Sequence, residues 1–94
     1  MSNVRRNPRR DANEAQIVAE LRRLGFLVLR LNAEDVPDLL LVHPRDGVVL
    51  VEIKTAGGSV SPGQQAMIDN INAHGGVAFI ARSTEEILHY LDIM

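Results

Sequence analysis

Short apolar runs separated by turn residues fill the middle of the chain, and longer stretches with helical spacing flank them. Two of these runs, Leu39–Val42 and Val48–Val51, are joined by Pro44-Arg45-Asp46-Gly47. An Asp-Gly pair shortly after a proline is a strong hairpin signal, so we expect two antiparallel strands here. Residues 26–31 form another short apolar run and predict a preceding strand.

The flanking stretches predict helices. Residues 11–24 place apolar side chains at helical spacing, with Asp11 or Asn13 as the N-cap and Gly25 as the stop signal. Ser61 followed by proline predicts the start of a second helix, which ends near residues 74–76.

The last part of the chain predicts a strand followed by a helix. Residues 77–81 form a fourth apolar run. Ser83 then opens the last helix, and Glu86 stands three residues later, as in a capping box. The last helix extends to Tyr90 or Leu91.

The order of these elements predicts an α/β fold, αβββαβα, with a mixed four-stranded sheet flanked by helices. A strand that returns through a helix to another strand implies a parallel, right-handed crossover, whereas the hairpin is antiparallel. Helices on both faces would explain why the strands are almost continuously apolar. We expect residues 11–94 to form one domain and residues 1–10 to form a basic, flexible arm.

Composition narrows the chemistry. The 94 residues include no cysteine, which excludes disulfides, thiolate zinc sites and a cysteine nucleophile. The three histidines fit no metal spacing with the carboxylates, and no apolar run approaches the ~20 residues of a membrane span. We therefore expect a soluble, cytoplasmic protein without membrane contact.

Charge is unevenly distributed, because the formal net charge is −2 although four arginines crowd the first ten residues. A basic arm of this kind can contact phosphates even on an acidic protein, or it can simply be a solubilising terminus. The arginines are Arg5, Arg6, Arg9 and Arg10.

The hairpin carries the candidate chemistry. Asp38 opens its first strand, and Glu52 and Lys54 close its second, so we expect Asp38 to face Glu52 while Glu52 and Lys54 share a face. Placing two carboxylates together costs free energy, and a divalent cation reverses that cost. Magnesium suits the site because it takes oxygen ligands and commonly uses one or two carboxylates. The Ile53 carbonyl can point toward the same pocket if the strand bends.

These residues resemble the PD-(D/E)xK nuclease superfamily and, within it, the VRR-Nuc family of small virus-type replication and repair nucleases. The resemblance extends from Glu14 onward and implies a restriction-endonuclease-like core. It rests on Glu14, Pro37-Asp38, Glu52-Ile53-Lys54 and Ser61-Pro62-Gly63-Gln64. The chain departs from the family at Asp35, where glycine is common two residues before the proline.

The resemblance implies roles for these residues. Asp38, Glu52 and the Ile53 carbonyl would bind Mg²⁺ or Mn²⁺, and Lys54 would assist the attacking water or the phosphate. Glu14, acting through a water molecule, and Gln64 would complete the catalytic set, while Ser61 and the four arginines would contact nucleic acid.

Single motifs have ordinary explanations as well. Glu52 and Lys54 alone could form a solvated salt bridge on an edge strand. Glu14 could be a first-turn acid favoured by the helix dipole, and Gln64 could be a capping residue. Their joint order and spacing favour the nuclease interpretation.

We therefore predict a metal-dependent DNA endonuclease that hydrolyses phosphodiester bonds, selects branched or junction DNA and acts as a homodimer. The resemblance suggests a role in DNA repair in a phage or its bacterial host cell. One alternative is a non-catalytic DNA-binding or complex-assembly module that retains the nuclease fold. Another is a small structural or interaction protein.

Overall fold

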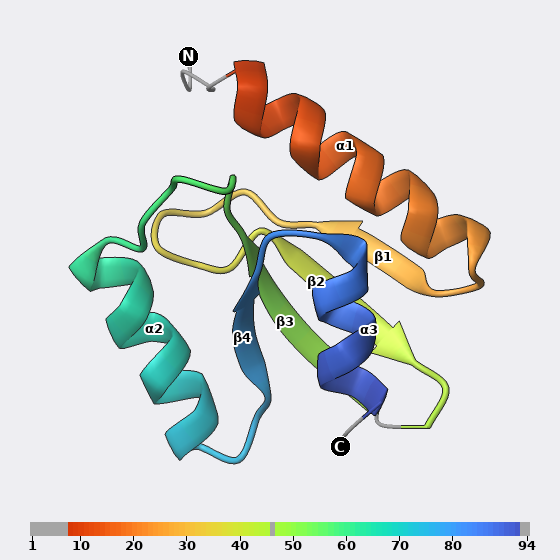
Figure 1. Cartoon of the computed structure of the whole chain (residues 1–94). Coiled ribbons are helices and arrows are strands. Elements are labelled where there is room, and N and C mark those ends of the chain that lie inside the picture. Colours follow the sequence, from red (N-terminus) through yellow and green to blue (C-terminus); the bar gives the residue numbers. More distant parts are fainter. Residues whose placement is uncertain (1–7, 46, 93–94) are drawn as a thin grey trace.

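A computed structural model describes residues 8–45 and 47–92, and for residues 8–12 it describes the backbone alone. Within these residues four strands form one sheet in the order β1-β2-β3-β4 (Figure 1). β1 pairs antiparallel with β2, β2 pairs antiparallel with β3, and β3 pairs parallel with β4. The strands are β1 (Leu27–Arg30), β2 (Leu39–His43), β3 (Gly47–Ile53) and β4 (Ala78–Ala81).

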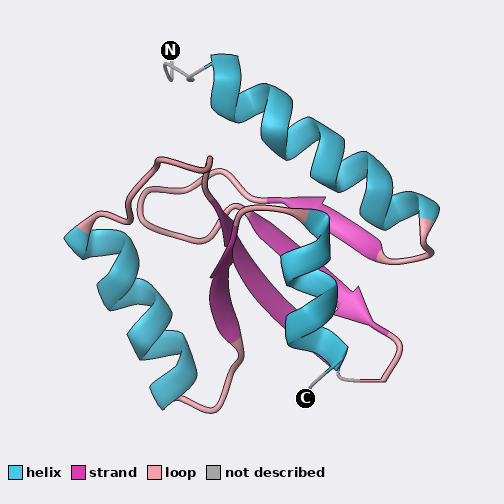
Figure 2. Ribbon diagram, in the orientation of Figure 1, coloured by secondary structure: helices cyan, strands magenta, loops and turns pink. Residues whose placement is uncertain are grey.

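Three helices accompany the sheet in the described part of the chain: α1 (Pro8–Arg23), α2 (Pro62–Ala73) and α3 (Thr84–Asp92). α1 packs on β1 and on α3, α3 also packs on β4, and α2 packs on β4 (Figure 2). The predicted order αβββαβα and the mixed sheet are therefore confirmed.

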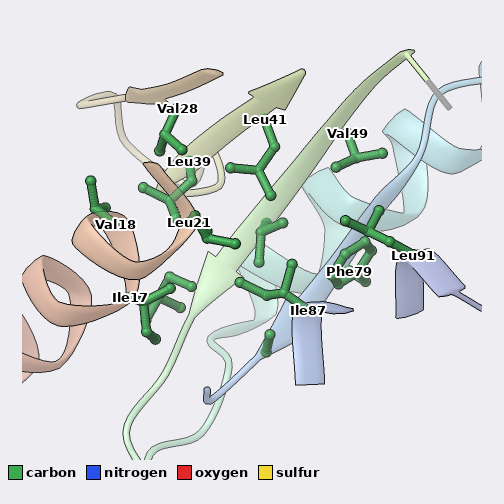
Figure 3. Close-up of a cluster of buried hydrophobic side chains, with 13 residues drawn as sticks. Ile17, Val18, Leu21, Val28, Leu39, Leu41, Val49, Phe79, Ile87 and Leu91 are labelled. Atoms are coloured by element: carbon green, nitrogen blue, oxygen red, sulfur yellow. The ribbon is translucent and has the colours of Figure 1, made fainter. Parts of the chain in front are cut away.

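The core lies between one face of the sheet and the helices α1 and α3 (Figure 3). Strand alternation explains its composition, because every second side chain points to that face. Leu39 pairs with Val51, and Val51 pairs with Phe79, so buried side chains continue from strand to strand. The helices contribute Ile17, Val18 and Leu21 from α1 and Ile87 and Leu91 from α3.

The opposite face of the sheet is also apolar but is partly exposed. Leu27, Leu29 and Val48 project there and are 56%, 47% and 52% exposed. Leu40, Val42 and Leu50 share that face and are half-buried. We call these six residues the open sheet face.

The ends of α1 show one agreement and one difference with the sequence. Gly25 adopts φ +98°, and the amides of Gly25 and Phe26 donate to the carbonyls of Arg22 and Leu21, which is a Schellman ending. The helix begins at Pro8 instead of near Asp11. The early residues are polar and give no apolar stripe, although proline fits the first turn of a helix.

The segment between β3 and α2 is held near its middle and at its end before α2. The Arg82 guanidinium donates to the Gly58 carbonyl at 2.9 Å. Ser61 caps α2 and forms a complete capping box with Gln64, as the Ser-Pro signal predicts for this helix start. None of the helices in the described residues is long and apolar enough to cross a membrane.

Candidate active site

The register of the hairpin brings Asp38 and Glu52 to the same end of the sheet. Leu39 pairs with Val51 and Leu40 with Leu50, so Asp38 and Glu52 are the next opposing positions. Directly opposing residues on antiparallel strands project to the same face. In addition, the Ile53 amide donates to Asp38 Oδ2 at 2.8 Å. The Asp38 carboxylate is thereby fixed beside the end of β3.

Glu52 and Lys54 lie together on the face of the sheet opposite the core. The Glu52 side chain is 1% exposed and the Lys54 side chain 12% exposed. Lys54 Nζ lies 3.4 Å from Glu52 Oε2. A buried carboxylate costs much free energy unless a cation or hydrogen bonds compensate its charge, and Lys54 contributes such a cation.

The hydrogen bonds at the end of β3 show in which direction the Ile53 carbonyl points. The Ile53 amide points toward Asp38, whereas the next amide, that of Lys54, donates to the Ala81 carbonyl at 3.1 Å. The N–H and C=O of one strand residue point to the same neighbouring strand. The Ile53 carbonyl is therefore directed toward the side of β3 where Asp38 stands.

Glu14 lies on the other side of the sheet. It is 4% exposed, and its Oε2 accepts from Arg30 Nε at 3.0 Å. Arg30 follows the alternation of Val28, whose side chain points into the core, so this ion pair lies on the α1 side. Because α1 begins at Pro8, Glu14 stands in its second turn, and the explanation as a first-turn acid does not apply.

Two residues near the site were not identified from the sequence as parts of it. Arg30 pairs with Glu14, 16 positions away, and the Asn13 side-chain amide donates to the Lys54 carbonyl at 3.3 Å, 41 positions away. Because α1 begins at Pro8, neither Asp11 nor Asn13 is the N-cap expected from the sequence. Contacts over such separations leave no local pattern. The only local signal was Arg30, a charged residue at the end of the otherwise apolar strand β1.

Gln64 is part of the helix cap. Its Oε1 accepts from the Ser61 amide at 3.1 Å, and Ser61 Oγ accepts from the Gln64 amide at 3.1 Å. Of the four arginines in the expected arm, Arg5 and Arg6 lie outside the described residues. Arg9 and Arg10 belong to the α1 backbone, and their side chains are not described.

The donors at the end of the hairpin fit a hard divalent cation. Two carboxylates, from Asp38 and Glu52, and one main-chain carbonyl, that of Ile53, are all oxygen ligands. Among the side chains that the structure describes, those of residues 13–45 and 47–92, no group of three histidine, cysteine or acidic residues forms a metal site. Magnesium does not require such a group, because it keeps several waters and often binds one or two carboxylates.

Comparisons with known proteins agree with this fold. The family model of the VRR-NUC domain matches residues 7–85. A solved structure named VRR_NUC domain superposes with a TM-score of 0.72 at 23% identity, covering 88% of this chain and 94% of its own. A second, named VRR_NUC domain protein, gives a TM-score of 0.52 at 23% identity, covering 80% of this chain and 59% of its own. No curated protein matches. The chain belongs to the VRR-NUC domain family, a nuclease-type family of DNA-processing domains.

Proposed function

We propose that this chain is a metal-dependent endonuclease that hydrolyses phosphodiester bonds in DNA. The observation that carries the proposal is the hydrogen bond from the Ile53 amide to Asp38 Oδ2, at 2.8 Å. It fixes the carboxylate of the Pro-Asp motif against the strand end that bears Glu52 and Lys54. Acid, acid and lysine from two separate motifs are thereby gathered at one end of the hairpin.

Asp38, Glu52 and the Ile53 carbonyl would hold Mg²⁺ or Mn²⁺. Such an ion, when bound, lowers the pKa of a coordinated water and neutralises charge that builds on the phosphate oxygens. Lys54 would hold its ammonium beside Glu52, where it can orient the attacking water or contact a phosphate oxygen. Asn13 would restrain the end of β3 through the Lys54 carbonyl.

Two further residues of the proposed set act from neighbouring elements. Glu14, held by Arg30, would support the end of the hairpin from the α1 side of the sheet and not from the face that carries Glu52 and Lys54. Gln64 would order the first turn of α2 through the capping box, which leaves Ser61 at the helix entrance for a phosphate. The arginines at 5, 6, 9 and 10 would extend this contact along the DNA backbone.

Recognition by backbone shape is favoured over base stacking. The ring of Phe79 is buried and stacks on Tyr90 with centroids 4.2 Å apart, and Phe26 lies 5.4 Å from His43. Phe79 is buried and Phe26 is half-buried, whereas Tyr90 is 41% exposed but has one ring face stacked on Phe79. These three residues are the aromatic residues of the chain, so no free aromatic ring face stands out for base stacking among the described residues. Proteins that bind single strands usually offer exposed aromatic platforms. We therefore propose a branched or double-stranded substrate, cut by a homodimer with two sites.

The test is cleavage of a panel of labelled DNA structures, namely duplex, nicked, flapped and junction DNA, with Mg²⁺, with Mn²⁺ and without metal. We expect cleavage that requires a metal and is strongest on branched DNA. Asp38→Asn and Glu52→Gln should abolish it while the circular dichroism spectrum stays that of a folded protein. Glu85→Gln, at an exposed acid of α3, is the matched control.

Undiminished cleavage by both site variants would refute the assignment. A protein that binds the labelled DNA but cuts no member of the panel and binds neither Mg²⁺ nor Mn²⁺ in calorimetry would instead be a non-catalytic DNA-binding module.

A further inference from the structure

Asp35 stands in a backbone conformation that its side chain does not favour. It lies in the connection between β1 and β2 and has φ +65°, in the left-handed region. Glycine adopts this region at no steric cost, whereas aspartate is among the few other residues found there. The conformation explains why glycine suits this position, and it implies that the aspartate side chain gains a contact that offsets the strain.

That contact is with Gly63, in the first turn of α2. A Cβ built on Gly63 would lie 2.6 Å from Asp35 Oδ2 and 2.7 Å from Oδ1 and Cγ. The carboxylate therefore occupies the space beside the Gly63 Cα that the side chain of any other residue at position 63 would fill. The first turn of a helix carries partial positive charge, which attracts a carboxylate.

The connection that bears Asp35 leads straight to the proposed metal ligand. The Val36 amide donates to the Ala33 carbonyl at 3.2 Å, and Pro37 is fully buried. The Leu31 amide donates to the Asp38 carbonyl at 2.7 Å and closes the connection. With the residues on both sides of Asp35 restrained, a shift of Asp35 would be transmitted to Asp38, three positions later.

We propose that Asp35 is a positioning residue. Its carboxylate packs beside Gly63 in the first turn of α2, and this contact keeps the Asp38 carboxylate in place beside the end of β3. This inference rests on the proposed nuclease function. It joins the two motifs that flank the site, because the first turn of α2 also carries Ser61 and Gln64. Asp35 would thus link the start of β2, which carries the Pro-Asp motif, to the first turn of α2.

The test is a double-mutant cycle of Asp35→Gly, Gly63→Ala and their combination. Gly63→Ala places a methyl group where the carboxylate sits, so we expect the Mn²⁺ concentration for half-maximal cleavage to rise by about 10-fold or more, as for losses of supporting contacts around a metal. In the Asp35→Gly background the methyl group meets no carboxylate, so the same substitution should change that concentration less than about twofold, well below the range for such losses. Asp35→Asn, which keeps the shape and tolerates the left-handed region, should retain most of the wild-type metal response.

Gly57→Ala is the control, because a Cβ there meets no atom within 4 Å. Equal effects of Gly63→Ala in both backgrounds would overturn the proposal. The two substitutions could also couple in urea unfolding but not in the metal response. The contact would then have only a structural role, and the proposal would again be overturned. If the wild type cuts no DNA, the proposed function fails, and the same cycle is measured by Mn²⁺ calorimetry. Lack of coupling there, or lack of Mn²⁺ binding by the wild type, would overturn the positioning role independently.

Discussion

Glu52 and Lys54 form a buried ion pair at the proposed site. The two side chains are almost completely buried, with Lys54 Nζ 3.4 Å from Glu52 Oε2. A hydrophobic pair of similar size would often be as stable or more stable at such a place. A contribution to folding therefore does not explain the charged pair, whereas the proposed nuclease chemistry would require it.

Lys54→Met should destabilise the protein in the absence of metal by about 3 kcal/mol, because it leaves less of the buried Glu52 charge compensated. Glu52→Gln/Lys54→Met should recover most of that loss, since it removes the second charge. Urea unfolding of the wild type and the three variants, Glu52→Gln included, in EDTA measures both quantities. Unchanged stability of Lys54→Met would contradict the importance of this ion pair. Added Mg²⁺ should restore part of the stability of Lys54→Met by replacing the lost cation.

At the level of elements, local signals predicted most of the fold and the hairpin part of the site. The hairpin signal predicted antiparallel strands whose register sets Asp38 opposite Glu52, and Gly47 at the start of β3 has φ +80°. The partners of α1 could not be predicted in the same way. Its contacts through Asn13 and Glu14 depend on where the helix crosses the sheet, which no neighbouring residue encodes.

The contact between α1 and α3 includes hydrogen bonds to the ionisable carboxylate of Glu20. Thr84 donates a short hydrogen bond to Glu20 Oε1, and Gln16 donates to Glu20 Oε2 at 3.2 Å. These bonds, that of Thr84 first, hold the pKa of Glu20 below its ordinary value of 4.5. A carboxyl whose pKa is lowered by folding stabilises the protein above its unfolded pKa, and this stability is lost as the pH falls through the folded pKa.

Thr84→Val should therefore lower the melting temperature at neutral pH, and the difference from wild type should shrink once the pH falls below 4.5. Thr84→Ser keeps the hydroxyl and should behave like the wild type. Melting curves recorded between neutral and acidic pH test this. A difference that persists unchanged in acid would assign the effect to packing of the valine instead of to Glu20.

At the scale of the whole molecule, the two faces of the sheet differ in how far they are exposed to solvent. One face is covered by α1 and α3, whereas the open sheet face keeps three large apolar side chains about half exposed: Leu27, Leu29 and Val48. Single exposed apolar residues are common on proteins, but a contiguous group of them marks an interaction surface. Small domains bury a limited share of their surface, so association through such a face adds the burial that one copy lacks.

The homodimer proposed above would use this face. The face adjoins the site because Leu40 and Leu50 lie two register positions from Asp38 and Glu52 and are the next pair on the same side of the sheet. Leu29→Glu and Val48→Glu should each shift the protein toward monomer, since each buries a charge against apolar groups in the dimer. Leu24→Glu is the matched control, because Leu24 is 58% exposed but follows α1 and lies off the sheet. Sedimentation equilibrium over a range of concentrations measures the shift. A wild type that stays monomeric throughout would exclude the dimer, and equal weakening by all three substitutions would show that the open sheet face is not its interface.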